Sequence, residues 1–175
     1  MQLGRRITRT RDGRFRVKIP ADEREILRSL PGQMREMLGT DHPALRRLFP
    51  PAYDDDVERS AEFDRLMREE LLDHHRGHLE IMEATAGATE LDEEQISAWM
   101  GAINGLRLAL GTRLEVTEEA YDRSVPEDDP RYPAFALFFY LGWLEEQIVE
   151  ALLAGVDRAG MPGAPDPPPP RTDLG

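Results

Sequence analysis

The sequence contains no cysteine, and this absence excludes several kinds of chemistry. Disulfide bonds, thiolate metal ligands, thiol nucleophiles and cysteine redox switches all require a side chain that the chain does not have. Lysine is nearly absent too, because Lys18 is the only one and the other Lys/Arg positions are all arginine. That bias is typical of a GC-rich coding sequence and indicates no particular function.

Long apolar runs are also missing. The longest uncharged stretch of the C-terminal helical segment, 132–144, is followed directly by Glu145 and Glu146. It is shorter than the roughly 20 apolar residues that a membrane-spanning helix needs. The first ten residues, MQLGRRITRT, lack the apolar core of a signal peptide. We therefore expect a cytoplasmic protein.

Acidic residues outnumber basic ones, and the imbalance is uneven along the chain. The net charge is −12 over 175 residues, a length that suits one domain. Residues 1–18 carry seven basic groups and one acid, so this segment has a charge of +6 and the remainder −18. A strongly acidic protein is disfavoured as a general nucleic-acid binder, which leaves the N-terminal arm as the segment suited to phosphate.

The segment 3–19 has the pattern of a β-hairpin around Asp12-Gly13, a dipeptide typical of tight turns. A two-residue loop would place Ile7 on the polar face. A three-residue loop ending in a left-handed Gly13 pairs Ile7 with Val17 and gathers the apolar side chains on one face. The opposite face then carries Arg6, Thr8, Thr10, Arg14, Arg16 and Lys18. Because a lone hairpin is marginally stable in water, its apolar face should dock on helices.

Helical patterns fill most of the remaining chain and predict a mainly α fold. We expect a single-domain bundle of about five helices with the N-terminal hairpin, over residues 1–155. The first helix starts after Pro20, and Pro31-Gly32 should kink it or divide it into two short helices. The other helices are expected at about 43–49, 56–86, 92–115 and 133–153.

Two further patterns mark helix boundaries. Asp92 and Gln95 form a capping-box pattern at the start of the helix 92–115. Residues 156–175 are rich in proline and have nothing to bury, so we expect a disordered tail there.

The stretch 133–153, PAFALFFYLGWLEEQIVEALL, is apolar on nearly every side. Such a helix belongs in the middle of a bundle or at a subunit contact. Two apolar stripes can be distinguished: Leu137, Leu141, Leu144, Ile148 and Leu152 form one, and Phe135, Phe138, Phe139, Val149 and Leu153 form the other. The helix pair 56–86 and 92–115 can cover one stripe. The first helix with the hairpin, or a second copy in a homodimer, must cover the other.

His74 and His78 stand four residues apart on the helix 56–86, and Glu70 lies one turn earlier. Two histidines at this spacing can share a metal such as zinc, and a carboxylate can supply a third ligand. The alternative is that the rings are interior histidines bonded to a neighbouring helix, or are exposed. No HExxH motif is present, so we expect no cofactor and keep Glu70, His74 and His78 as metal-ligand candidates.

Arg107 falls inside the apolar face of the helix 92–115. A buried guanidinium needs a partner, because leaving it unpaired costs roughly 3 kcal/mol or more. We expect an ion pair with Glu145 or Glu146 of the C-terminal helix, and anion binding is the alternative.

The basic face of the hairpin is the candidate for contact with DNA or with a protein partner. Its contact residues would be Arg6, Arg14, Arg16 and Lys18. β-Ribbons that bind a DNA groove are known, but contacts to phosphate position a protein without specifying a sequence. A solvated strand face that balances the acidic helices is the alternative.

Motifs of common enzyme classes do not occur. The sequence has no phosphate-binding loop, nucleophile elbow, dinucleotide fingerprint or zinc-ribbon spacing. Acidic clusters at 54–56 and 92–94 stand where helices begin, and capping explains them. We therefore expect a protein without enzymatic activity.

Four stretches together resemble a known family: EREILRSLPGQMREML, HPALRRLFPPAY, LDEEQISAWMGAINGLRLALGTRLEV and YPAFALFFYLGWLEEQIVEAL. They are similar to the actinobacterial family of domains of unknown function that includes the oxidative-stress transcriptional regulator AosR. The resemblance covers residues 2–154, and LRLALGTRL followed by LGWLEEQ is its most specific part.

The resemblance implies a cytoplasmic regulator that acts with an alternative sigma factor at promoters of stress and cysteine-biosynthesis genes. The family's switch is an intramolecular disulfide in a Cys-x-x-x-Cys motif, and no residue of this chain can take that role. We therefore expect a non-enzymatic regulator that contacts a sigma factor or RNA polymerase. One alternative is an accessory factor of Clp-type proteolysis, which gene proximity in the family implies. The other is a metal-binding protein or enzyme using the His74 and His78 pair.

Overall fold

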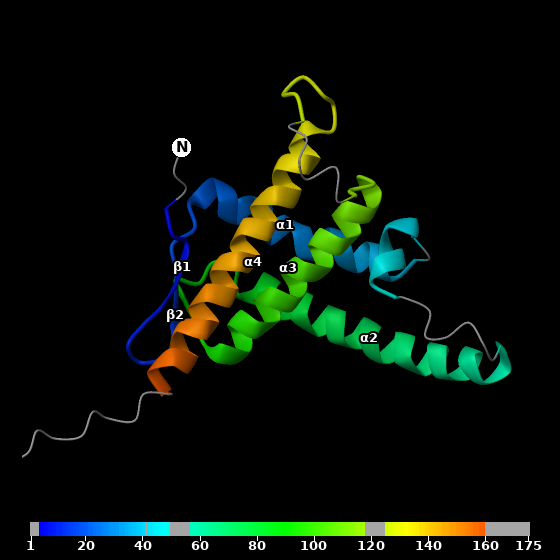
Figure 1. The fold of residues 1–175 in the computed structure, drawn as a ribbon, viewed down its shortest axis with the longest axis horizontal. Coiled ribbons are helices and arrows are strands. Elements are labelled where there is room, and N and C mark those ends of the chain that lie inside the picture. Colours follow the sequence, from blue (N-terminus) through cyan, green and yellow to red (C-terminus); the bar gives the residue numbers. More distant parts are fainter. Residues whose placement is uncertain (1–3, 41, 50–56, 118–124, 160–175) are drawn as a thin grey trace, which may run out of the picture.

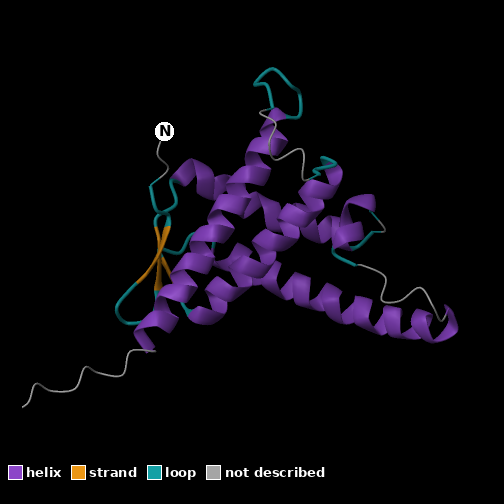
Figure 2. Ribbon diagram, in the orientation of Figure 1, coloured by secondary structure: helices purple, strands orange, loops and turns teal. Residues whose placement is uncertain are grey.

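The computed structural model describes residues 4–40, 42–49, 57–117 and 125–159, without the side chains of 57–64 and 156–159. It is mainly helical, with a small sheet at one side of the helices (Figure 2). The elements in chain order are β1 (Ile7–Arg9), β2 (Phe15–Val17), α1 (Ala21–Leu38), the 3₁₀ helix η1 (Pro43–Arg47), α2 (Val57–Thr85), β3 (Glu90–Leu91), α3 (Glu93–Arg113) and α4 (Tyr132–Ala159). The predicted mainly α fold is confirmed.

The N-terminal hairpin has the register that its apolar pattern predicts. Ile7 pairs with Val17, and Gly13 adopts a φ of 85° in the turn. Phe15 is fully buried, and Ile7, Val17 and Ile19 are each at most 5% exposed. The apolar face therefore docks on the helices as expected.

A third strand extends the hairpin and was not predicted. β3 pairs antiparallel with β2, so that Phe15 lies opposite Leu91 and Arg16 opposite Glu90. The strand order is β1-β2-β3. A strand of two residues carries too short an alternation for the sequence pattern to show it.

Helix α1 runs as one helix through Pro31, so of the two expected outcomes, a kink or a division into two short helices, the division is wrong. Pro31 cannot donate a hydrogen bond to the preceding turn. Its ring is buried on the same face as Leu27, Met34 and Leu38, and this packing offsets the missing bond. The helix ends at Leu38, and Gly39 is its C-cap.

Helix α3 is the centre of the molecule, because it packs on α1, α2, α4 and η1. Ile96, Trp99 and Ile103 are fully buried along it. Its first turn has the predicted capping box, in which Asp92 accepts from the Gln95 backbone at 2.8 Å and Gln95 accepts in return at 3.0 Å. The sequence indicated that the C-terminal helix lies at the centre of the bundle. In the structure, α3 packs on more helices than α4 does.

Helix α4 crosses α3, and the sheet lies beside its C-terminal half (Figure 1). One predicted stripe is buried at its middle positions, since Leu141, Leu144 and Ile148 are at most 1% exposed. The main contacts of α4 are with α3 and β1, whereas those of α2 are with α1 and α3. The helix 92–115 therefore covers this stripe as expected, and the helix 56–86 has no comparable share in the cover.

The second stripe of α4 is divided. Phe135 and Phe138 are buried in a small cluster with Leu114 and Val116 near the start of the helix. Phe139, Val149 and Leu153 remain 41%, 40% and 57% exposed. Because α1 and the hairpin do not cover these three, an apolar face stays open to solvent.

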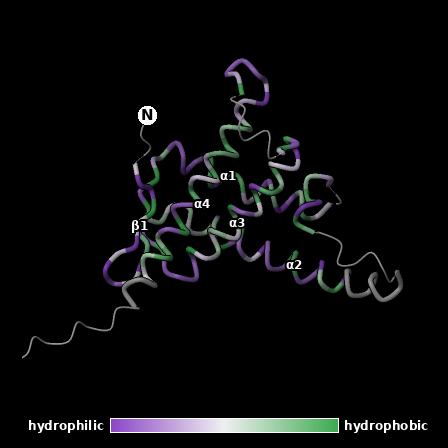
Figure 3. The backbone as a smooth tube through the Cα atoms, viewed as in Figure 1, coloured by the Kyte–Doolittle hydropathy of each residue, from purple (hydrophilic) through white to green (hydrophobic). Residues whose placement is uncertain are grey.

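Helix α4 continues to Ala159, so the domain boundary expected at residue 155 falls inside a helix. The rest of the predicted tail, 160–175, lies outside the described residues, as does the acidic cluster at 54–56. Within the described chain, no helix combines the length and hydrophobicity that crossing a membrane requires. The hydrophilic segments include the hairpin turn and the loop before α4 (Figure 3).

Candidate functional site

The basic face of the hairpin is split by the tertiary structure. Arg6 lies with its Nη2 2.7 Å from the Oε1 of Glu23, and both side chains are about one-fifth exposed. Hydrogen bonding to Glu23 raises the pKa of Arg6 above its usual value. Arg6 therefore holds β1 to α1, which separates it from the other candidate contacts.

The remaining cations of that face stay accessible. Arg14 and Arg16 lie 3.7 and 3.6 Å from Glu90 of β3, with about half of each side chain exposed. Lys18 is exposed next to them in the chain. Glu90 partly balances this cluster, and the sequence did not indicate that it would lie there.

Two polar residues that the sequence did not single out fasten the sheet and α1 to α4. Glu23 accepts a 2.7 Å hydrogen bond from the hydroxyl of Tyr140. Burial is the larger cause, and this hydrogen bond the second, that raises the pKa of Tyr140. The buried side chain of Gln147 accepts from the backbone N–H groups of Arg6 and Ile7 at 2.6 and 3.3 Å. These contacts fix the orientation of α4 and hence of its open face.

The structure brings Arg107 of α3 together with Glu145 of α4. Nη1 of Arg107 lies 2.7 Å from Oε2 of Glu145, and the two side chains are 30% and 20% exposed. Arg107 also lies over the ring of Phe138 at 5.3 Å and close to Gly142, where an added Cβ would be 3.1 Å from its Nε. Glu146 does not join them, because it is exposed and makes no ion pair with the described side chains.

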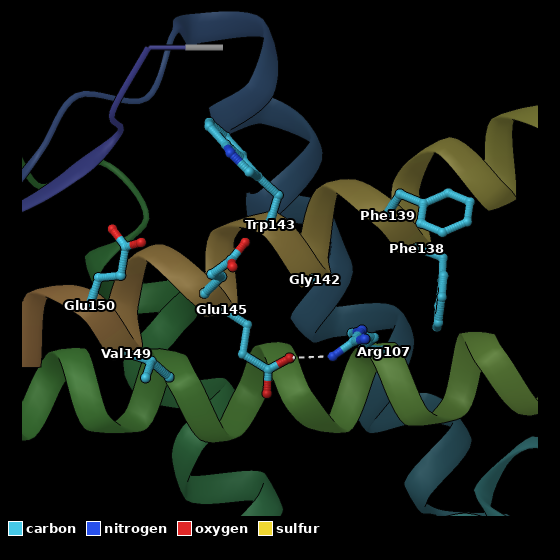
Figure 4. A pocket seen from close by; sticks show the side chains of 9 residues that line it. Arg107, Phe138, Phe139, Gly142, Trp143, Glu145, Val149 and Glu150 are labelled. Carbon is cyan, nitrogen blue, oxygen red and sulfur yellow. Dashed lines mark hydrogen bonds and ion pairs between the residues drawn. The ribbon is translucent and has the colours of Figure 1, made fainter. Parts of the chain in front are cut away.

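An open groove of about 710 Å³ runs along α4 beside this ion pair (Figure 4). We call it the α4 groove, and its lining residues are Arg107, Phe138, Phe139, Gly142, Trp143, Glu145, Glu146, Val149 and Glu150. In the close view, Phe139 points away from Arg107 while Phe138 extends toward α3. The groove thus combines exposed aromatic and aliphatic surface with charged side chains.

One side of α4 carries a line of residues along the groove. Phe139, Gly142, Glu146 and Val149 of the groove and the exposed Leu153 beyond it follow one another at spacings of three and four. This side of α4 is acidic, because Glu146 makes no ion pair with the described residues and the neighbouring Glu150 pairs with the exposed Arg5 at 2.9 Å. An apolar helix with basic flanks is complementary to such a surface.

Two of the histidines of α2, His75 and His78, lie against α3. The rings of His74 and His78 are 4.0 Å apart, and His74 is exposed. His75 contacts the ring of Phe49 edge-on, with 5.9 Å between the ring centroids. His78 is half-buried over Gly101, and its buried Nδ1 has no hydrogen-bond partner.

The three-ligand metal arrangement, kept as an alternative for these residues, is not formed by the described side chains. Within the part of the chain that the structure describes, no group of three His, Asp or Glu side chains is placed to hold a metal ion. Glu70 therefore does not complete a site with His74 and His78. The helix spacing brought the two rings together, but the third ligand needed a geometry that α2 does not provide.

Acidification is expected to destabilise the protein through His75 and His78. Burial, and secondarily the neighbouring His74, lowers the pKa of both below the usual 6.5. The folded state then binds fewer protons than the unfolded state, so stability is lost as pH falls through about 6.5 and is unaffected above it. Urea midpoints measured from pH 8 to pH 5 should show this loss, and His75→Gln with His78→Gln should reduce it. An unchanged pH profile in the double variant would contradict the assignment.

The geometry defines a small, mainly helical protein with an open groove of aromatic and acidic side chains on α4. The chain belongs to the family described as a domain of unknown function, DUF2017, whose model matches residues 4–152. The family expected from the sequence is thereby confirmed.

The relatives found among curated proteins have names that describe a role. The oxidative stress regulator AosR of Mycobacterium tuberculosis is 32% identical over 186 residues, which covers 82% of this chain and 85% of the relative. The protein of the same name from Mycobacterium bovis matches to the same extent. No solved structure matches the chain.

Proposed function

We propose that this chain is a non-enzymatic regulatory protein that acts in a stress response by binding another protein along the α4 groove. The name of the relatives, oxidative stress regulator, supports the regulatory role. Because the chain has no cysteine, the binding event and not thiol oxidation carries the regulation.

The observation that carries the proposal is the exposure of large apolar side chains beside a groove. Phe139 and Val149 are 41% and 40% exposed in the open groove of about 710 Å³. Contiguous exposed apolar surface with a polar rim is typical of protein interaction sites. Aromatic side chains are also frequent among the residues that dominate binding energy.

The charge of the groove favours a different protein over a second copy. A symmetric contact through 133–153 would place the acidic line of one copy against that of the other. Glu146 and Glu150 would then face like charges, which is unfavourable. We therefore propose a partner helix with apolar and basic residues, and the family resemblance points to a sigma factor or RNA polymerase.

DNA contact would be secondary to this protein contact. Arg14, Arg16 and Lys18 are exposed on the sheet that packs beside α4. Three cations on one strand face can meet phosphates once a partner has placed the protein at a promoter.

Placing a carboxylate in the α4 groove is expected to weaken partner binding. Phe139→Asp and Val149→Asp should each raise the dissociation constant about tenfold or more, since a buried contact residue contributes over roughly 1 kcal/mol. The fold should tolerate both changes because the side chains are exposed. The measurement is binding of the full-length chain to purified sigma factors and RNA polymerase of the same organism.

Ile26→Asp is the matched control, because Ile26 is 50% exposed on α1 and does not line the groove. This variant should bind as the wild type does. Equal binding by all four proteins would place the contact on another surface. Capture of Clp components in place of the transcription proteins would instead support the accessory role in proteolysis.

A further inference from the structure

A second, more enclosed cavity lies where α1 passes across α3 and α4. Its volume is about 210 Å³, and its walls are mostly aliphatic. Met34 and Met37 come from α1, Leu110 from α3 and Leu137 from α4. Small residues such as Ala109 line part of it, and they leave space that larger side chains would fill. Methionine side chains adapt to different shapes, so such a wall can close around an apolar group.

A polar cleft of about 530 Å³ adjoins the apolar cavity. Ala44 of η1 and Arg113 of α3 line both spaces, which makes them neighbours. The cleft also contains Arg46 and Arg47 from η1. Glu115 is its one acidic member among the described residues, so the cleft is positive in a chain whose net charge is −12.

None of the three arginines has an ion-pair partner among the residues that the structure describes. Arg47 donates to the backbone carbonyl of Val116 at 3.2 Å. Arg46 and Arg113 are exposed and have no ion pair with any described residue. The negative end of the α3 dipole stabilises the positive charge of Arg113. The dipole does not explain why Arg46 of η1 lines the same cleft. A ligand with negative charge would balance them.

We propose that the two spaces together bind a small amphiphile, with an apolar chain in the cavity and an anionic head in the arginine cleft. An engineered apolar cavity of about 150 Å³ admits benzene, so a space of this size takes a short chain rather than a long lipid tail. The head is a carboxylate or a phosphate monoester, which arginine recognises by paired hydrogen bonds. This site shares no residue with the α4 groove and does not depend on the proposed partner.

Calorimetry with octanoate, octyl phosphate and octanol tests the proposal on the wild-type chain. The two anions should bind more tightly than octanol, and comparing them identifies the head that the cleft prefers. Affinity should rise roughly fourfold per added methylene from butanoate upward until the cavity is full. High salt should weaken the anions and leave octanol unchanged. Equal binding of octanoate and octanol, or no binding of either anion, would overturn the proposal.

Variants in the two spaces should give different patterns. Arg113→Gln should weaken octanoate about fivefold without affecting octanol, as expected for one exposed ion pair. Ala134→Leu, at a half-buried position of the cavity wall, should weaken both ligands. Arg65→Gln is the matched control, since Arg65 is exposed on α2 and lines neither space. The same response to Arg113→Gln and Arg65→Gln would overturn the assignment of the head group.

A variant that enlarges the cavity tests the position of the apolar chain independently of Ala134→Leu. Met37→Ala should move the best-binding chain to a longer carboxylate, decanoate over octanoate, because it adds space at the wall. Met37 is only half-buried, so the fold should persist, and circular dichroism checks this. An unchanged preference for chain length would contradict placement of the tail in this cavity.

Discussion

Replacing Arg24 by methionine is expected to lower the free energy of unfolding by about 3 kcal/mol. The guanidinium donates to the backbone carbonyls of Ile19, Ala86 and Ala88 at 2.8–2.9 Å and of Val17 at 3.2 Å. It thereby joins the end of β2, the start of α1 and the loop between α2 and β3. Methionine keeps much of the aliphatic packing but leaves four acceptors without this donor. Urea unfolding at pH 7.5 measures the loss.

Two variants test whether the hydrogen bonds are responsible. Arg28→Met removes an exposed arginine one turn further along α1 and should change stability by less than about 0.5 kcal/mol. Arg24→Lys keeps the charge but offers fewer donors in a different geometry, so its stability should fall between wild type and Arg24→Met. If Arg24→Lys were as stable as the wild type, the charge alone would account for the effect.

Replacing Gly101 by alanine is expected to destabilise the protein by about 2 kcal/mol. A Cβ at this position would overlap the ring of His78, which packs from α2 onto α3. The ring cannot rotate freely, because it also lies against His74 at 4.0 Å between centroids. Either the ring or the two helices must move apart, and the packing of α2 on α3 weakens. Thermal and urea unfolding both report this change.

The same substitution should become favourable once the ring is removed. In a His78→Ala background, Gly101→Ala is expected to stabilise the chain by about 0.5–1 kcal/mol, because alanine is the better helix former. Gly77→Ala is the control within α2, since an added Cβ there meets nothing within 4 Å, and it should also be stabilising. A loss of stability for Gly101→Ala that persists without His78 would mean that another contact is responsible.

The hairpin shows what local patterns can predict. The positions of Ile7, Phe15 and Val17 relative to Gly13 were sufficient to select the register, because a shift of one residue would expose every apolar side chain. The capping box at Asp92 is another local signal that the structure contains. Both depend on residues within one turn or one strand pair, where few alternative geometries exist.

Arg107 and Arg24 differ in whether their structural role was predicted from the sequence. Arg107 was singled out because it falls inside an apolar helix face, and the structure places it 2.7 Å from Glu145. Arg24 has the same signal, since it stands three residues before Leu27 on the buried face of α1. The position of Arg24 on an apolar helix face was therefore sufficient to predict that it needs a partner. Its four carbonyl partners would not have followed, because they come from separate elements.

The candidate site was predicted only in part. The sequence placed Phe139, Val149 and Leu153 in an apolar stripe that another element or a second copy would have to bury. The structure buries Phe135 and Phe138 of the same stripe and leaves those three exposed. Which residues remain open depends on where α1 and β1 lie, and Glu23 with Gln147 sets that position. The arginine cleft had no sequence signal, because Arg46 and Arg47 come from η1 and Arg113 comes from α3, far along the chain.

The sequence by itself determined the mainly helical class, the hairpin with its register and the absence of any thiol chemistry. These properties follow from composition and from periodicity within single elements. The tertiary structure decided that α3 is the centre, that α1 passes through Pro31 intact and that one side of α4 stays exposed. It alone decided these because each depends on side chains that meet across long sequence separations, where no local period records the contact.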